Sequence, residues 1–322
     1  MLEPGGLYEM VADAPQLHEP VLLVALDGFV DAGNATRLGI EAIQAGRTAR
    51  PVVRFDADQL VDYRSRRPPL RFDTDRWVAY AAPELAVVAL SDTASADYLL
   101  LAGPEPDTQW ERFAAAVEQL VRKLGIRLVI NLAAIPMAVP HTRPIGVTVH
   151  GTRPELTEGN QAWFTTADVP GSAIAVMEYR LGEAGHAAMG VAVHVPHYLS
   201  RAEYPQAARV LLDHVGLAAG LYLPTESLTT AAVRADAEIA EQVAASDEVR
   251  QVVEALEKQY DMVVSGRAEP TGMELGADLP SADELGAEVE RFLAGHSPEP
   301  PATGPTNEPD PGSDDEDRPE QP

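Results

Sequence analysis

The chain of 322 residues contains no cysteine, and it has no apolar run long enough for a membrane-spanning helix. The missing cysteine excludes disulfide bonds, thiolate metal sites and cysteine nucleophiles, and it fits a reducing compartment. A membrane-spanning helix needs ~20 consecutive apolar residues. The first residues carry neither a basic nor an apolar targeting segment. We therefore expect a cytoplasmic protein with no membrane partner.

Basic residues are scarce, because 24 Lys and Arg stand against 50 Asp and Glu, for a net charge of −26. The imbalance is greatest in residues 226–322, which hold 24 of the acidic residues and only 6 of the basic ones. Binding to nucleic acid depends on clustered Lys and Arg. The composition thus argues against a nucleic-acid partner.

Familiar catalytic motifs are also missing. The sequence has no Gly-x-Ser-x-Gly elbow, no phosphate-binding loop and no dinucleotide fingerprint. Four histidines fall in the second half (His141, His150, His194 and His197), but no glutamate–histidine helix motif accompanies them. We predict neither a cofactor nor a metal site.

Residues 21–26 (Val-Leu-Leu-Val-Ala-Leu) form an apolar run that predicts a strand buried on both faces. A turn at Asp27-Gly28 and a helical pattern from Gly33 follow, which is the opening unit of an α/β fold. Further strands are expected near residues 52–55, 85–90, 98–101, 126–132, 145–149 and 187–195, and helices near 110–124 (capped by Asp107), 172–181 and 204–221. Short strands near 70–72 and 77–81 suggest a hairpin that breaks the alternation. The pattern predicts a three-layer α/β/α domain with a mixed, mostly parallel sheet.

Three regions follow from composition and periodicity. Residues 1–225 form the α/β core, with residues 1–20 as a leader of little periodicity. Residues 226–296 form a helical extension, signalled by a cap at Ser246 and by a capping box at residues 281–284. Residues 297–322 are rich in proline and acid, hold no aromatic or large aliphatic residue, and are expected to be disordered.

The turn after the first strand carries two acids, Asp27 and Asp31. They are candidates for a metal site or an acid–base pair. The alternative is structural, with Asp31 or Asn34 capping the following helix and Asp27 bonding the turn backbone.

A second candidate is the loop 140–144 (Pro-His-Thr-Arg-Pro), which presents His141 and Arg143 between two strands. It could bind an anion or polarise a substrate. It could equally be a tight connection whose arginine pairs with one of the many acids.

The only basic cluster spans residues 62–67 and contains Tyr63, Arg64, Arg66 and Arg67. Arginine and tyrosine are enriched in protein interfaces. We favour a solvated or subunit-contacting loop here over an anion site.

Several of these segments together resemble the proteasome assembly chaperone 2 family in its actinobacterial form. The matching segments are residues 28–35 (Gly-Phe-Val-Asp-Ala-Gly-Asn-Ala), 55–68, 101–107, 135–144 and 195–199 (Val-Pro-His-Tyr-Leu). The resemblance covers about residues 20–225 and implies a phosphorylase/hydrolase-like α/β/α fold. It also implies a non-enzymatic, chaperone-like or scaffold role, self-association as a trimer, and proteasome subunits as a possible partner.

Two qualifications accompany this resemblance. Assembly chaperones of this kind dock through a C-terminal hydrophobic-Tyr-X tail, whereas this chain ends Pro-Glu-Gln-Pro. The family also supplies no established catalytic residues. The alternative function is a small-molecule enzyme of phosphorylase or hydrolase type, whose site at the carboxyl ends of the strands would bring together Asp27, Asp31, His141, Arg143 and His197.

The composition of residues 297–322 yields the first prediction. Ordering them would cost roughly 1–2 kcal/mol of backbone entropy per residue, with almost no apolar burial to offset it. Deletion of residues 297–322 should therefore leave the melting temperature of the protein nearly unchanged, as measured by calorimetry. Strong amide-exchange protection beyond Ser297 in the full chain would contradict this.

Overall fold

The computed structural model describes residues 2–28, 30–160, 163, 166 and 168–266. Its strands are β1 (Tyr8–Met10), β2 (Val21–Asp27), β3 (Arg50–Phe55), β4 (Leu70–Asp73), β5 (Arg76–Tyr80), β6 (Ala86–Ser91), β7 (Asp97–Pro104), β8 (Leu128–Met137), β9 (Val147–Gly151) and β10 (Ala188–Pro196). Its helices are α1 (Ala35–Gln44), α2 (Ala57–Leu60), α3 (Trp110–Leu124), α4 (Ala173–Glu183), α5 (Pro205–Ala219), α6 (Glu226–Ala245) and α7 (Asp247–Val264).

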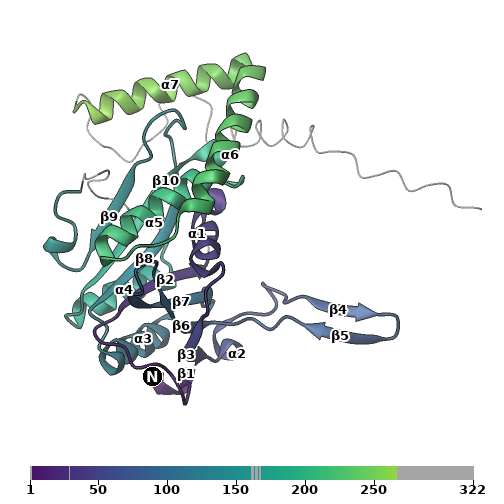
Figure 1. Cartoon of the computed structure of the whole chain (residues 1–322), viewed down its shortest axis with the longest axis vertical. Coiled ribbons are helices and arrows are strands. Elements are labelled where there is room, and N and C mark those ends of the chain that lie inside the picture. Colours follow the sequence, from purple (N-terminus) through teal and green to yellow (C-terminus); the bar gives the residue numbers. More distant parts are fainter. Residues whose placement is uncertain (1, 29, 161–162, 164–165, 167, 267–322) are drawn as a thin grey trace, which may run out of the picture.

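Eight strands form one mixed sheet in the order β1-β3-β6-β7-β2-β8-β10-β9. The four central strands β7, β2, β8 and β10 run parallel, and antiparallel strands extend the sheet on both sides. Helices α1 and α5 pack on one face and α3 and α4 on the other (Figure 1). The predicted three-layer α/β/α fold is confirmed.

Strand β2 explains this arrangement. All of its residues from Val21 to Leu26 are buried. Because side chains alternate across a strand, Leu23 packs in the core on the α1–α5 side and Leu22 in the core on the α3–α4 side. The apolar run in the sequence therefore marks the centre of the sheet.

Three local predictions need correction. Residues 1–20 are not a featureless leader, because β1 pairs with β3 at the sheet edge and Leu7 is fully buried. Strand β8 does not end near residue 132 but continues to Met137, paired with β10 from Val129 to Met137. Asp107 does not cap α3, which begins at Trp110 after Gln109; the Asp107 carboxylate instead accepts the backbone N–H of Asp62 at 2.7 Å.

The helical extension is described through α6 and α7. The predicted cap is confirmed, since the Ser246 hydroxyl accepts the backbone N–H of Val249 at 3.3 Å. Leu228 and Ile239 of α6 join the core on the α5 side of the sheet. The capping box at 281–284 and the tail lie outside the described residues. None of the described helices has the length and apolar character that crossing a membrane requires.

Strand β10 carries a polar side chain that is buried inside the protein. His194 is fully buried, its Nε2 is 2.8 Å from the Thr148 hydroxyl, and its ring meets Trp163 edge to face at 4.9 Å. Burial lowers the pKa of His194 to about 4, because the charged ring would lose its hydration.

This burial predicts an acid-sensitive fold. In the unfolded chain His194 takes up a proton below pH ~6.5, whereas the folded chain resists it, so stability is lost as the pH falls below that value. At about pH 5 the loss from this residue should be ~2 kcal/mol. Denaturant titrations of the wild type and of His194→Gln at about pH 7.5 and 5 measure it. The variant should lose less stability between the two pH values, and equal losses would refute the assignment.

Candidate functional site

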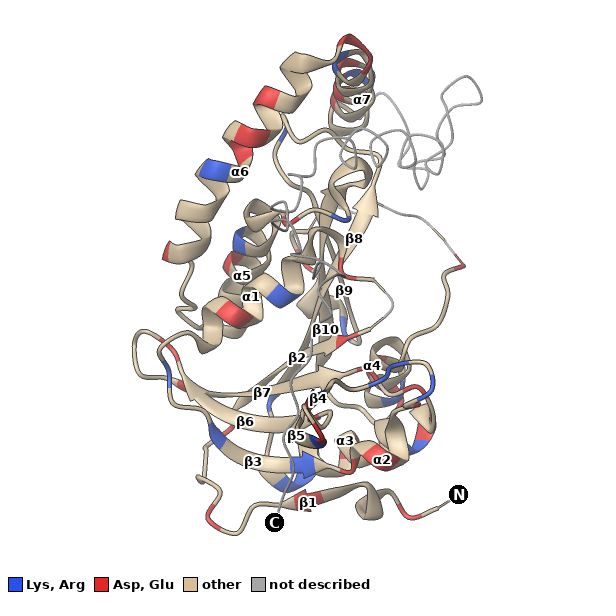
Figure 2. Cartoon of the chain, turned by 90° about the vertical axis from the view of Figure 1, so that its right-hand side faces the viewer, with Lys and Arg blue, Asp and Glu red and all other residues tan. Residues whose placement is uncertain are grey.

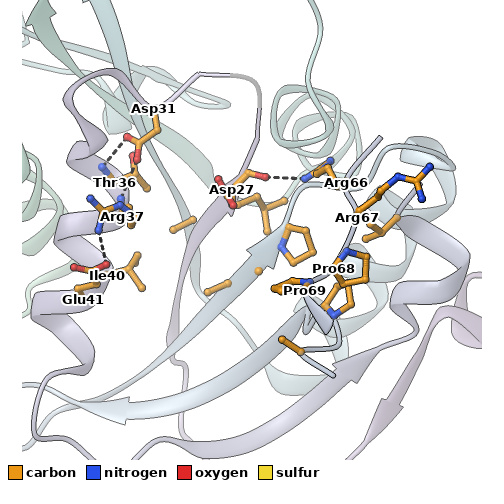
Figure 3. A pocket seen from close by; sticks show the side chains of 18 residues that line it. Asp27, Asp31, Thr36, Arg37, Ile40, Glu41, Arg66, Arg67, Pro68 and Pro69 are labelled. Atoms are coloured by element: carbon orange, nitrogen blue, oxygen red, sulfur yellow. Dashed lines mark hydrogen bonds and ion pairs between the residues drawn. The ribbon is translucent and has the colours of Figure 1, made fainter. Parts of the chain in front are cut away.

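A cavity of about 460 Å³ opens beyond the carboxyl ends of β2 and β7 (Figure 3). Its floor is apolar, with Ala25, Ile40 and Val61 among its residues, and the prolines at the base of the β4–β5 hairpin form one wall. Charged side chains surround its rim: Asp27, Asp31, Arg37, Glu41, Arg66 and Arg67. Ligands of open α/β sheets commonly bind at this edge.

The two acids of the turn have different roles here. The carboxylate of Asp31 accepts the backbone N–H groups of Thr36 at 2.8 Å and Arg37 at 3.0 Å, so it caps the first turn of α1. Asp27 offers its backbone carbonyl to Arg66 at 3.0 Å. Within the described part of the chain, no three His, Asp or Glu side chains are arranged to hold a metal ion.

Arg66 joins the hairpin base to this edge of the sheet. Its guanidinium donates to the carbonyls of Asp27 (3.0 Å) and Glu105 (2.6 Å) and also pairs with the Asp107 carboxylate. Most of its donors are therefore used within the chain. Of the other residues in the basic cluster, Tyr63 donates its hydroxyl to Asp58, Arg64 is held by its backbone N–H, and Arg67 lines the cavity.

The second candidate, the loop 140–144 with Ile145 after it, does not line this cavity but packs against α7. Arg143 forms two 2.9 Å hydrogen bonds with the carboxylate of Asp261 and a 3.2 Å ion pair with Glu257. The Tyr260 hydroxyl donates to the carbonyl of Pro144 at 2.9 Å. Arg143 lowers the pKa of Asp261 through these hydrogen bonds. The arginine thus anchors the helical extension to the core.

His141 and His197 flank Tyr198 near the same loop. His141 contacts the Tyr198 hydroxyl through its backbone N–H (2.9 Å) and its Nδ1 (2.7 Å). His197 is half-buried, and its ring lies edge to face on Tyr198 at 5.5 Å. Burial lowers the pKa of both histidines.

The five candidate catalytic residues are not brought to one cavity. Asp27 and Asp31 line the first cavity, His141 and Arg143 line a second one, and His197 lines neither. The length of β8 separates them, because Asp31 bridges to Ala134 and the strand continues for three more residues, about 10 Å, before the loop begins. The geometry that the second function hypothesis requires, with all five residues at one cavity, is therefore not found among the described residues.

The hairpin β4–β5 was predicted, but its position was not. It projects away from the body of the molecule (Figure 1), and every residue of both strands is exposed. Five large apolar side chains are 49–65% exposed on it: Leu70, Phe72, Trp77, Val78 and Tyr80. The one aromatic contact within it is the edge-to-face pair of Phe72 and Trp77 at 5.1 Å. We call residues 70–80 the hairpin arm.

These features define an α/β/α protein with a protruding hairpin arm and a docked helical extension. The chain belongs to the PAC2 family, whose model matches residues 25–243. This confirms the resemblance inferred from the sequence.

Several solved structures of similar proteins come from actinobacteria. A Mycobacterium tuberculosis protein of unknown function is 47% identical, with 82% of this chain and 93% of that chain covered and a TM-score of 0.76. A Corynebacterium glutamicum protein of unknown function is 36% identical (81% and 99% covered, TM-score 0.77). A Mycobacterium tuberculosis proteasome-assembly chaperone homologue is 27% identical (72% and 99% covered, TM-score 0.66). None of the curated proteins compared is similar enough to match.

The contacts of Arg66 predict that removal of its side chain loosens the hairpin. Arg66→Ala should release the base of the hairpin and lower the free energy of unfolding by about 1–2 kcal/mol, since the lost hydrogen bonds are partly exposed. Amide exchange in residues 64–83 should accelerate. Arg64→Ala is the matched control, because Arg64 donates to the Asp62 carboxylate through its backbone N–H, which the substitution keeps. Equal exchange in the two variants would contradict the proposed role of Arg66.

Proposed function

We propose that the protein is a non-catalytic, self-associating scaffold with a chaperone-like role, and that the hairpin arm is its main contact. The observation that carries the proposal is the exposure of five large apolar side chains on an unsupported two-stranded sheet. The 27% identity to a proteasome-assembly chaperone homologue supports the chaperone-like role.

The stability of the arm argues for a partner. An isolated two-stranded hairpin is marginally stable in water, and a third strand or a packed surface is needed to stabilise it. Exposed apolar patches of this kind mark interaction sites. Covering the exposed parts of the five side chains would contribute on the order of 5 kcal/mol.

The charge at the base of the arm favours a second copy of the chain as that partner. The segment that leads into the arm, residues 64–69, carries three arginines and no acid, and the arm itself carries two arginines and two aspartates, in a chain of net charge −26. Helices α6 and α7 carry an excess of acidic side chains (Figure 2) and also expose Val233 and Met262. Opposite charge steers such surfaces together. We therefore infer a cyclic homo-oligomer, with a trimer as the first expectation.

The arm gives a direct test of self-association. The double variant Phe72→Ser/Trp77→Ser should shift the protein to monomer at about 10 µM, measured by light scattering, because the apolar contact is lost. Circular dichroism should be unchanged, since both side chains are exposed in the single chain. Leu217→Ser, which changes an exposed leucine on α5, should leave the oligomer intact. A monomeric wild type would overturn this part of the proposal.

The chaperone-like role is tested by capture of partners from a proteasome-bearing actinobacterium. Tagged full-length chain and a version lacking residues 226–322 serve as baits. Specific recovery of proteasome subunits, or of another defined assembly intermediate, would support the role. Recovery of no specific protein with either bait would contradict it.

A further inference from the structure

A second cavity, of about 420 Å³, lies between the loop 140–145, α5 and α6. We call it the α5–α6 cavity. Its polar lining comes from His141 on the loop, Tyr204, Gln206 and His214 on or beside α5, and Asp236 on α6. These residues are distant in sequence and belong to both the core and the helical extension.

The hydrogen bonds of His141 determine which ring nitrogen carries the proton. The Tyr198 oxygen accepts the backbone N–H of His141, so its own proton is free for Nδ1 of the ring, 2.7 Å away. Nδ1 is then an acceptor, and the neutral ring carries its proton on Nε2. Burial lowers the pKa of His141, which keeps the ring neutral at pH 7. His141 therefore lines the cavity as a donor.

His214 has the opposite hydrogen-bonding role and lines the cavity as an acceptor. Its Nδ1 lies 2.9 Å from the Val210 carbonyl of its own helix, and a carbonyl can only accept. The proton is therefore on Nδ1, and Nε2 of the neutral ring is an acceptor. Asp236 adds a carboxylate close enough to His141 and Tyr204 to act on both electrostatically. Tyr204 and Gln206 each offer both a donor and an acceptor.

The charges of the lining disfavour an anionic ligand. Arg143 is already paired with Asp261, and Arg209 with Asp213 at 2.9 Å. Asp236 adds a further carboxylate to the lining. A phosphate or carboxylate would thus meet an acid, and both arginines of the lining are already engaged by aspartates.

We propose that the α5–α6 cavity binds a small, neutral, polyhydroxylated molecule such as a monosaccharide or cyclitol. Each hydroxyl of such a ligand both donates and accepts, which matches the mixture of donors and acceptors in the lining. The volume lies within the range of small-molecule sites. The bound ligand would contact the core and α6 at once. The proposal is independent of the hairpin arm.

Ligand-detected NMR of the full-length protein tests this with D-ribose, D-glucose and myo-inositol, and with orthophosphate as the anionic probe, each at about 10 mM. At least one neutral polyol should bind, and orthophosphate should not. Asp236→Ala should weaken polyol binding at least ~10-fold, because a hydrogen bond to a charged acceptor is lost. Glu238→Ala is the matched control on the same helix and should bind as the wild type does.

Three results would overturn the proposal: no binding of any of the three polyols, preferential binding of orthophosphate, or equal affinity in Asp236→Ala and Glu238→Ala. Asp236 is exposed on α6, so its removal should not unfold the chain. Gln206→Ala, on α5, tests the core side of the same cavity and should also weaken polyol binding.

Discussion

Strand β2 is buried on both faces over six consecutive residues, and the placement of most polar groups near the sheet centre follows from this constraint. A strand of this kind can carry polar side chains only at or beyond its end. Asp27 and Asp31 therefore lie at the carboxyl edge, where one offers a carbonyl and the other caps α1. The polar groups of β2 and of the turn after it are limited to that edge and to the cavity that opens there.

Arg66 connects this constraint to the surface of the molecule. Two of its hydrogen bonds go to carbonyls at the ends of β2 and β7, which the sheet holds in place. The prolines that follow stiffen the entry to the hairpin arm. The sheet thus sets the direction in which the arm leaves the body of the molecule. Because the arm points away from the body, its apolar side chains stay exposed and do not pack in the hydrophobic core.

The sequence predicts the structural features that depend only on the pattern of neighbouring residues. The β2 run, the hairpin strands and the Ser246 cap are all local, and all are present in the structure. Asp107 shows where this reasoning fails: its partner Asp62 is 45 residues away, and no spacing rule contains that contact. The separation of Asp31 from His141 depends likewise on the extra length of β8, which pairing with β10 determines. The α5–α6 cavity was missed because Tyr204, His214 and Asp236 form no recognisable motif.

The distribution of charge also constrains how copies of this chain can meet. A uniformly acidic surface would make copies repel one another. Here three arginines at residues 64–67 lie at the base of the arm, the arm itself is balanced in charge, and the extension around α6 and α7 is acidic. Contact between two arm bases, or between two extensions, would bring like charges together, whereas the base of the arm against the extension brings opposite charges together. Such a contact joins two different surfaces, so under the proposed self-association it is heterologous and must close into a ring to leave no arm uncovered.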